Sequence, residues 1–428
     1  MQQRPGEAMA EATDIVRITD ETLERMRARV GIQVPEPRRY HNDVVTQDSA
    51  RHFAWGYGDA TPLYCDAQYG LTTRWGGLIG APAFAYTMGE DDVPPLSAEM
   101  KQQMKGDPLA GLGLYQAEMQ LEWWEPLREG DRCFLRKAQV GTRLTQGRTG
   151  GKSIHEVRGI FQRNQDGNPV AMRRGTFFAT ERDPKRTENK RDSTPEPAPQ
   201  PYTQAELDAI DACYEAEIAS RRGAEPRYWE DVSVGDRIGP MVKGPLKVTD
   251  QILWHMGWGL HMSPPGAFRM TYDVRKKVPG MFPKDPMGIP DTVQRCHWQP
   301  DWAQRLGFPT AYDYGAQREV WFTHLISNWM GDDAWLWKLT AKHHKFNFLG
   351  DTTWMTGEVT AKEEIDGHKL AHVNLTGTNR AEETSSSGHA VVILPSRDGG
   401  PIDLPSPPAP DLTGLIEHQV EEYRSIYG

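Results

Sequence analysis

Two segments of the sequence carry side chains that could exchange protons with a bound molecule. The segment 58–64, GDATPLY, places Asp59 and Tyr64 five positions apart. The segment 296–301, CHWQPD, contains His297, whose imidazole gains and loses a proton near neutral pH. Tyr64 can donate a hydrogen bond, but a phenol with a pKa of about 10 is a poor base. These residue types indicate general acid–base chemistry.

Each of these residues also has a structural interpretation. A Gly-Asp-x-x-Pro loop can use Asp59 only to close an Asx-turn onto its own backbone. Tyr64 can serve packing alone, and His297 can be an ordinary buried histidine. We favour the functional interpretation for Asp59 and His297, whereas the two interpretations are balanced for Tyr64.

Three carboxylates lie close enough in the sequence to orient His297. Asp291 precedes the histidine by six positions, and Asp301 and Asp313 follow it. Asp313 also stands just before a predicted helix, where capping of the helix N-terminus is the competing role.

The candidate segments are followed by predicted helices and strands in a repeated order. Residues 315–330, GAQREVWFTHLISNWM, carry apolar side chains at helical spacing and stop before Gly331, which predicts a helix. A shorter counterpart begins at Ala81-Pro82, with proline at the helix start. Strand-like runs follow at about 131–143, 153–163 and 169–180, and again at about 352–363, 368–379 and 387–394. One helix followed by an antiparallel meander, occurring twice, predicts the α+β class.

The clearest boundary is the segment 183–201, which is rich in charge and proline and lacks apolar periodicity. It predicts a linker with polyproline character. A helix should follow it, because Thr203 and Glu206 have the spacing of a capping box. We therefore predict two domains, 1–182 and 224–428, joined by a linker and helix over 183–223.

Length and composition narrow the class of protein. The chain has 428 residues, 38% of them hydrophobic and 25% charged, which suits two soluble domains. It has no apolar run long enough for a membrane span and no pattern of a secretory signal at its N-terminus. The net charge of -10 argues against nonspecific binding to nucleic acid. The four cysteines lack paired spacing, so we expect no disulfide framework, no metal site and a cytoplasmic location.

The sequence resembles the double-hotdog acyl dehydratases, which are related to the MaoC-like and type-2 enoyl-CoA hydratases. GDATPLY resembles their G-D-x-N-P-(aliphatic)-H signature, with Tyr64 in place of the histidine. The resemblance extends over 53–57, 73–77, 80–82 and 126–131 in the first half, and over 228–236, 297–298, 312–315 and 328–333 in the second. The implied fold is a pseudo-dimer of two hotdogs, each an antiparallel sheet wrapped around a central helix.

The resemblance implies a hydro-lyase that reversibly hydrates a 2-enoyl-CoA or dehydrates a 3-hydroxyacyl-CoA, in a fatty-acid-like or side-chain degradation route. We expect a coenzyme A thioester as substrate, no other cofactor, and a homodimer or larger homo-oligomer. Two alternatives stay open, because neither half holds an intact Asp/His pair. One is a hotdog thioesterase, and the other is a catalytically weak acyl-CoA-binding subunit that works beside another hotdog protein.

In such a fold, the N-terminus of the central helix directs free N–H groups and a positive dipole end at the thioester oxygen. Gly80 and Gly315 are therefore the expected oxyanion-binding positions, with simple turn geometry as the alternative. Tyr314 stands where related enzymes often carry a histidine. The candidates for contact with coenzyme A phosphates are Arg74, Arg318 and Lys342.

The two halves divide the catalytic pair between them. The first half retains Asp59 but has no imidazole at Tyr64, and the second has His297 but an aspartate one position out of register. Because imidazole is the better base, we predict that His297 activates water and that one of its three neighbouring carboxylates orients it. Asp59 with Tyr64 is the alternative site.

Overall fold

The computed structural model of the chain describes residues 16–36, 39–146, 151–181, 200–259 and 266–428. The predicted linker, 183–201, lies outside the described residues except for its last two positions.

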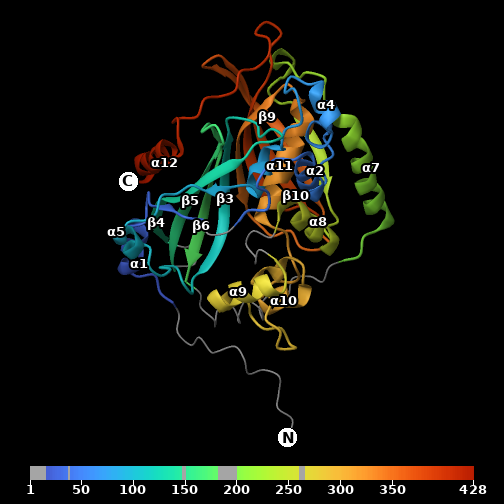
Figure 1. Cartoon of the computed structure of the whole chain (residues 1–428). Helices are drawn as coiled ribbons and strands as arrows, with labels where there is room; N and C mark the ends of the chain where they lie inside the picture. The colour runs from blue at the N-terminus through green and yellow to red at the C-terminus, as the bar shows by residue number, and fades with distance from the viewer. Residues whose placement is uncertain (1–15, 37–38, 147–150, 182–199, 260–265) are drawn as a thin grey trace.

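The eleven strands found in these residues form one continuous sheet (Figure 1). The strands before the linker are β1 (Gln33–Val34), β2 (Glu90–Asp91), β3 (Gly113–Trp123), β4 (Cys133–Gln146), β5 (Lys152–Asn164) and β6 (Pro169–Thr180). Those after it are β7 (Arg237–Lys243), β8 (Trp335–His343), β9 (Thr353–Ile365), β10 (His368–Asn379) and β11 (Thr384–Ile393). The order across the sheet is β1-β4-β5-β6-β3-β8-β11-β10-β9-β7, and β2 pairs with β4 in parallel.

The two halves meet edge to edge where β3 pairs antiparallel with β8. Leu121 lies opposite Leu339 in this register, and Glu118 lies opposite Lys342. Both leucines are buried in a hydrophobic core that draws side chains from both halves. The predicted α+β class is confirmed.

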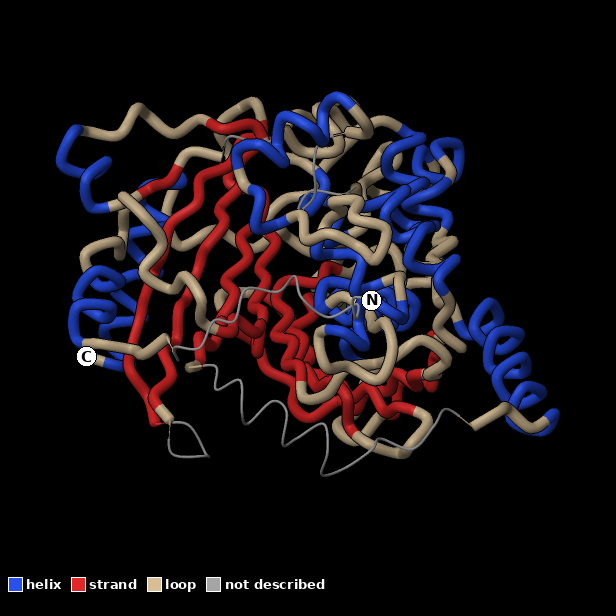
Figure 2. The backbone as a smooth tube through the Cα atoms, turned by 90° about the horizontal axis from the view of Figure 1, so that it is seen from below, coloured by secondary structure: helices blue, strands red, loops and turns tan. Residues whose placement is uncertain are grey.

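The helix α11 (Gly315–Met330) occupies the centre of the second half, as predicted. Every residue from Gln317 to Met330 is buried, and the helix packs against β7, β8, β9 and β11. An apolar helix enclosed by a curved sheet needs no polar face, which explains why tryptophan, phenylalanine and leucine occupy several of its sides. Figure 2, seen from below, shows the strands through the middle of the molecule, with helices on both sides of them.

The first half has a much shorter counterpart. Only the 3₁₀ helix η1 (Pro82–Thr87) follows the predicted start at Ala81-Pro82, and five of its six residues are buried. A six-residue 3₁₀ segment has little dipole to offer, because few of its peptide units are aligned. The pseudo-symmetry of the two halves is therefore incomplete at their centres.

The remaining helices surround the sheet and connect its halves. They are α1 (Asp20–Arg27), α2 (Gln47–Gly56), α3 (Pro62–Cys65), α4 (Ala67–Leu71), α5 (Ala98–Gln103), α7 (Gln204–Ser220), η2 (Trp229–Asp231), α8 (Val248–Trp258), α9 (Arg269–Lys277), η3 (Pro279–Met281), η4 (Val293–His297), α10 (Pro300–Arg305) and α12 (Leu412–Tyr427). The predicted capping box of Thr203 and Glu206 opens α7. No helix in the described ranges combines the length and apolar character needed to cross a membrane.

Candidate active site

The start of α11 leaves backbone donors without acceptors. Tyr314 precedes the helix in an extended conformation, and its N–H donates to the side-chain oxygen of Gln317 at 2.8 Å. Within the described chain, the N–H groups of Gly315 and Ala316 have no protein acceptor. These two residues are partly exposed, whereas the rest of α11 is buried. A helix start of this kind binds negatively charged oxygen.

His297 lies directly beside this helix start. Its ring stacks on that of Tyr314, with centroids 3.6 Å apart and planes 25° from parallel. Its Nδ1 lies 2.9 Å from the carbonyl oxygen of Tyr312. Because a carbonyl can only accept, Nδ1 carries the hydrogen and Nε2 keeps its lone pair. Burial lowers the pKa of His297 to about 4, so the imidazole is neutral at neutral pH.

None of the three predicted carboxylates forms a hydrogen bond with His297 in the described residues. Asp291 has a side chain that is 54% exposed and lies 3.7 Å from Arg295. Asp301 is exposed in the first turn of α10. Asp313 is buried and accepts two hydrogen bonds from Arg318, at 2.5 and 2.6 Å. The orienting group is instead the backbone carbonyl of Tyr312.

A wall of aromatic rings adjoins His297 and Tyr314. The hydroxyl of Tyr314 lies 3.0 Å from Nε2 of His255, whose pKa burial lowers to about 4. The His255 ring stacks with Trp258 and meets Trp298 edge-on. The flanks of the helix start are thus apolar, and that environment strengthens any hydrogen bond made there.

On the other side of the helix start lies a polar cluster that joins both halves. Glu319 of α11 is fully buried and accepts hydrogen bonds from the hydroxyl of Tyr86, at 2.5 Å, and from Nε2 of Gln116, at 2.7 Å. His343, the last residue of β8, places its Nε2 3.4 Å from Glu319. Tyr86 and Gln116 belong to the first half, whereas Glu319 and His343 belong to the second.

The GDATPLY segment forms a different cluster. Asp59 accepts from the Thr61 N–H at 2.8 Å and from the Tyr57 hydroxyl at 3.1 Å, so the Asx-turn geometry is present. One of its oxygens also lies 3.3 Å from Nε2 of His324, a residue of α11. Both side chains are fully buried. Asp59 of the first half therefore contacts an imidazole, that of His324, which belongs to the second half.

Two further charged groups enclose His324. Lys243 on β7 donates a hydrogen bond to its Nδ1 at 2.8 Å, and Glu217 of α7 lies 3.3 Å from its Nε2. Burial lowers the pKa of His324 to about 3, despite the opposing effect of Asp59. Burial lowers the pKa of Lys243 and raises that of Glu217. Because Nδ1 of His324 accepts from Lys243, the hydrogen of the neutral ring is on Nε2, and no lone pair is left for a base.

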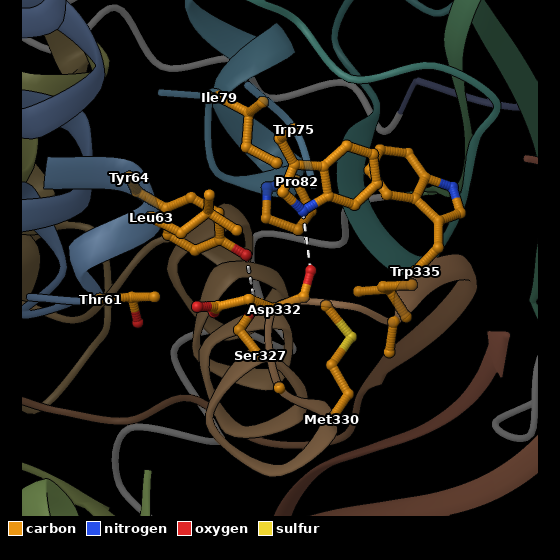
Figure 3. A pocket seen from close by; sticks show the side chains of 14 residues that line it. Thr61, Leu63, Tyr64, Trp75, Ile79, Pro82, Ser327, Met330, Asp332 and Trp335 are labelled. Carbon is orange, nitrogen blue, oxygen red and sulfur yellow. Dashed lines mark hydrogen bonds between the residues drawn. The ribbon is translucent and has the colours of Figure 1, made fainter. Parts of the chain in front are cut away.

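Tyr64 lines a small internal cavity next to this network (Figure 3). Its hydroxyl lies 3.0 Å from Oγ of Ser327, and burial raises its pKa. Trp75 closes another side and donates a hydrogen bond from its indole to the backbone oxygen of Asp332, at 2.7 Å. The space, about 20 Å³, is sufficient for one water but not for an acyl chain.

Gly80 does not provide an oxyanion-binding N–H, which corrects the sequence-based expectation. Its N–H donates to the carbonyl oxygen of Leu127 at 2.8 Å. A Cβ at this position would lie 2.9 Å from the ring of Phe84, so glycine is needed for packing. Only Gly315 of the two predicted positions combines a free N–H with a long helix.

Comparison with known proteins agrees with this architecture. Residues 29–173 match the family model described as FAS1-like, dehydratase domain region. A solved MaoC-like dehydratase superposes with a TM-score of 0.58 at 14% identity, covering 86% of this chain and 99% of its own. A protein named as a MaoC domain dehydratase, from Chloroflexus aurantiacus J-10-fl, gives a TM-score of 0.50 at 14% identity, covering 86% and 96%. No curated protein matches the sequence.

The chain has the double-hotdog fold, and the match to the FAS1-like dehydratase domain model lies within its first half. The long helix of this double hotdog lies in the second half, beyond the residues that match the family model. The free helix start and His297 are therefore found outside the matched region.

One of the three residues predicted to contact coenzyme A is buried in an ion pair, and the other two lie away from the start of α11. Arg318 is buried in its pair with Asp313, so it cannot meet a phosphate, which corrects that prediction. Lys342 is exposed, and strand alternation directs it to the face of β8 opposite His343. Arg74 lies over the Trp75 ring and donates to the carbonyl oxygen of Ile402 at 2.7 Å.

Sequence reasoning missed the groups that the double hotdog brings together across its halves. Glu319 and His324 gave a signal, since both interrupt the apolar helix 315–330 at positions that such a helix buries. A buried polar side chain needs a partner, which marks both residues for attention. Their partners lie in distant segments, and no motif in the sequence connects them.

Proposed function

We propose that this chain is a hydro-lyase that reversibly adds water to a 2-enoyl-CoA, or removes it from a 3-hydroxyacyl-CoA. One observation carries the proposal. A neutral imidazole with a free Nε2, that of His297, stacks on the residue that directly precedes the unpaired N–H groups of Gly315 and Ala316.

In the hydration direction, Nε2 of His297 takes a proton from water while the water oxygen attacks Cβ of the enoyl group. Electron density moves through Cα to the thioester oxygen. The N–H groups of Gly315 and Ala316, with the dipole of α11, stabilise the charge that develops on this oxygen. A proton then reaches Cα, and dehydration follows the same steps in reverse.

The Tyr312 carbonyl replaces the carboxylate of the related signature in orienting the base. A carbonyl fixes the tautomer through the Nδ1 hydrogen bond, but it adds no negative charge to stabilise the imidazolium that forms. Burial lowers the pKa of His297 to about 4, although the hydrogen bond to Tyr312 and the charge of Asp313 oppose the shift. We therefore expect activity to persist into mildly acidic solution and to fall as the pH approaches about 4.

The decisive experiment follows the loss of enoyl-thioester absorbance with crotonyl-CoA and the purified chain. Replacing His297 with alanine should lower kcat by about 10²–10⁴-fold, because general base catalysis contributes that much. The matched control is His418→Ala, a histidine exposed on α12. If the His297 variant keeps near-normal kcat, the site is assigned wrongly. Loss of this absorbance together with release of free thiol would identify a thioesterase instead.

Self-association and the coenzyme A moiety belong to the same proposal. The outer strands β1 and β7 leave sheet edges that a second copy can cover. Light scattering after size-exclusion chromatography should report at least a dimer. A monomer at all concentrations would contradict the proposed self-association. Absence of detectable acyl-CoA binding would contradict the proposed substrate.

A further inference from the structure

We propose that the helix α9 and the chain around it bind the phosphate groups of coenzyme A. The inference rests on the proposed function, whose substrate is a coenzyme A thioester, and it names the contacts for the end of the substrate that does not react. Residues 266–290, which include α9 and η3, are called the inserted segment. Arg318 is buried in its pair with Asp313, so the phosphates need other cations.

The inserted segment belongs to the half that carries His297. In the first half, residues 57–61 alone join α2 to α3, the short helix of Tyr64. In the second half, the connection from α8 to η4, which ends at His297, runs over 259–292. The extra chain is therefore found in the half with the free helix start. The first half has no counterpart between α2 and α3, where every residue is described.

Both ends of the connection 259–292 adjoin the residue that precedes α11. Trp258, the last residue of α8, has its ring centroid 5.4 Å from that of Tyr314. His297, the last residue of η4, stacks on the same ring with centroids 3.6 Å apart. A thioester held at the start of α11 therefore lies near the base of the inserted segment.

A buried arginine holds the inserted segment against η4. Arg295 of η4 is 1% exposed, and its guanidinium donates a hydrogen bond to the carbonyl oxygen of Pro283 at 3.0 Å. Phe282, the preceding residue, is buried as well. The helix α9 has no buried residue, and Figure 1 shows it at one end of the molecule, outside the sheet. The segment is thus fixed near η4, while α9 is accessible to a ligand.

The inserted segment is positively charged in a protein whose net charge is -10. It contains five lysines and arginines and two aspartates. Arg269 pairs with Asp273. The second aspartate, Asp285, accepts hydrogen bonds from two backbone N–H groups of its own turn, at 2.8 and 2.9 Å. Among the described residues, no ion pair is formed by the other four cations, Arg275, Lys276, Lys277 and Lys284. A local excess of positive charge attracts a polyanion such as coenzyme A.

Three of these cations gather around one aromatic ring. The ring centroid of Tyr272 lies 4.5 Å from Nζ of Lys276. It lies 5.4 and 5.5 Å from the guanidinium carbons of Arg275 and Arg269. Cations gathered in this way repel one another, and a bound polyanion offsets that repulsion. Lysine and arginine are the usual partners of phosphate, and arginine adds paired N–H donors. The phosphate site is therefore expected at these three cations.

The shape of coenzyme A suits this arrangement. Its thioester and its phosphates lie at opposite ends of the molecule and are joined by the flexible pantetheine arm. The thioester oxygen binds the Gly315 N–H, and the arm leads away from the helix start toward the cations of α9. Contacts remote from the reacting bond bind substrate and transition state alike, so they act on KM and leave kcat unchanged.

The test compares crotonyl-CoA with crotonyl-pantetheine, which carries the same thioester and no phosphate. In the wild type, added salt should raise KM for crotonyl-CoA and leave KM for crotonyl-pantetheine unchanged. The double variant Arg275→Gln/Lys276→Gln should raise KM for crotonyl-CoA by about 2–30-fold at constant kcat, as expected for two exposed ionic contacts. Its KM for crotonyl-pantetheine should equal that of the wild type. The matched control, Lys101→Gln/Lys105→Gln, removes the same charge from exposed positions of the first half.

An unchanged KM for crotonyl-CoA in the double variant would overturn the inference. An equal rise for both substrates would also overturn it, because the effect would then be independent of phosphate. If the double variant does not fold, the salt dependence of the wild type decides, and equal dependence for both substrates counts against the inference.

Calorimetric titration with free coenzyme A separates this inference from the proposed function, because it needs no activity. Weaker binding to the double variant, in a protein without hydratase activity, would support the phosphate site and contradict the proposed function alone. Hydration that depends on His297 but not on the cations of α9 removes only the present inference.

Discussion

Asp59 belongs to a motif that suggests catalysis, but its contacts indicate a structural role. Its carboxylate is buried, closes an Asx-turn and contacts His324, while Lys243 and Glu217 complete the network. Removing one member of a buried charged network leaves the others uncompensated. Asp59 thus connects the loop after α2 to the central helix of the other half, and its contribution to stability follows from that position.

We therefore expect Asp59→Asn to lower the free energy of unfolding by about 3 kcal/mol, the cost typical of breaking a buried pair. Folded Asp59→Asn should retain kcat, because the proposed reaction uses His297. Urea unfolding and crotonyl-CoA kinetics on the same preparation measure both effects. The control is Asp398→Asn at an exposed position, which should change stability by less than about 0.5 kcal/mol.

A double-mutant cycle separates the pair from its surroundings. If Asp59 and His324 interact as the 3.3 Å contact indicates, the double variant should lose less stability than the sum of the single variants. Full additivity would contradict the network. Loss of kcat by several orders of magnitude in a stable Asp59→Asn protein would instead return the active site to the first half.

At the scale of elements, the helices α2 and α8 cross at glycine. A Cβ on Gly257 would lie 2.5 Å from the backbone oxygen of His52, and a Cβ on Gly56 would lie 3.0 Å from that of Leu253. Backbone atoms cannot rotate away as a side chain does, so these helices approach only because both positions lack a side chain.

Gly257→Ala should consequently lower the free energy of unfolding by about 1–3 kcal/mol or more, as overpacking does. Thermal and urea unfolding would measure the loss. The matched substitution is Gly280→Ala, where the added methyl meets no atom within 4 Å. Equal stability of the two variants would show that α2 and α8 can separate without cost.

The elements that sequence predicts well are those with local signals. The segment 315–330 begins with one glycine, is followed by another and forms α11, and the runs predicted at about 352–363 and 368–379 form β9 and β10. The first-half helix was predicted only as a shorter counterpart that starts at Ala81-Pro82, and it is the 3₁₀ helix η1; its end has no local signal in the sequence. The strands β3 and β8, which join the halves, were not predicted as strands in full.

The candidate site was less predictable, because its partners depend on long-range pairing. His297 and Gly315 were identified from their segments, and the structure places them beside one another through Tyr314. The Tyr312 carbonyl could not be identified, since every residue has a carbonyl. The contact between Glu319 and Gln116 requires the register of β3 against β8, which no local pattern specifies.

For the whole molecule, the last helix ties the C-terminus to the first half. The apolar residues Leu415, Ile416 and Val420 of α12 pack with Val140 and Phe161 of β4 and β5 in a separate hydrophobic cluster (Figure 1). The two halves thus contact each other at the β3–β8 junction, through α11 and through the C-terminal helix α12. Such repeated crossing favours unfolding of both halves together.

Three neutral histidines, the fully buried His324 and the partly buried His255 and His297, should make that unfolding sensitive to acid. Burial lowers the pKa of His324 to about 3 and those of His255 and His297 to about 4. In the unfolded chain a histidine takes up a proton near pH 6.5. Between the two values only the unfolded state binds the proton, so stability falls as the pH drops from about 6.5 toward 4. Carboxylates whose pKa burial raises, such as Glu217, act in the opposite direction, so the total slope alone is not diagnostic.

The contribution of one histidine is therefore measured as a difference. Each buried neutral histidine adds about 1.4 kcal/mol per pH unit to the slope of unfolding free energy in this window. His324→Gln cannot take up that proton in either state, so its slope should be shallower than that of wild type by about this amount. His418→Gln, which removes an exposed histidine, should leave the slope unchanged. Parallel slopes for wild type and His324→Gln in urea titrations across pH 6.5 to 4 would mean that His324 is protonated in the folded protein.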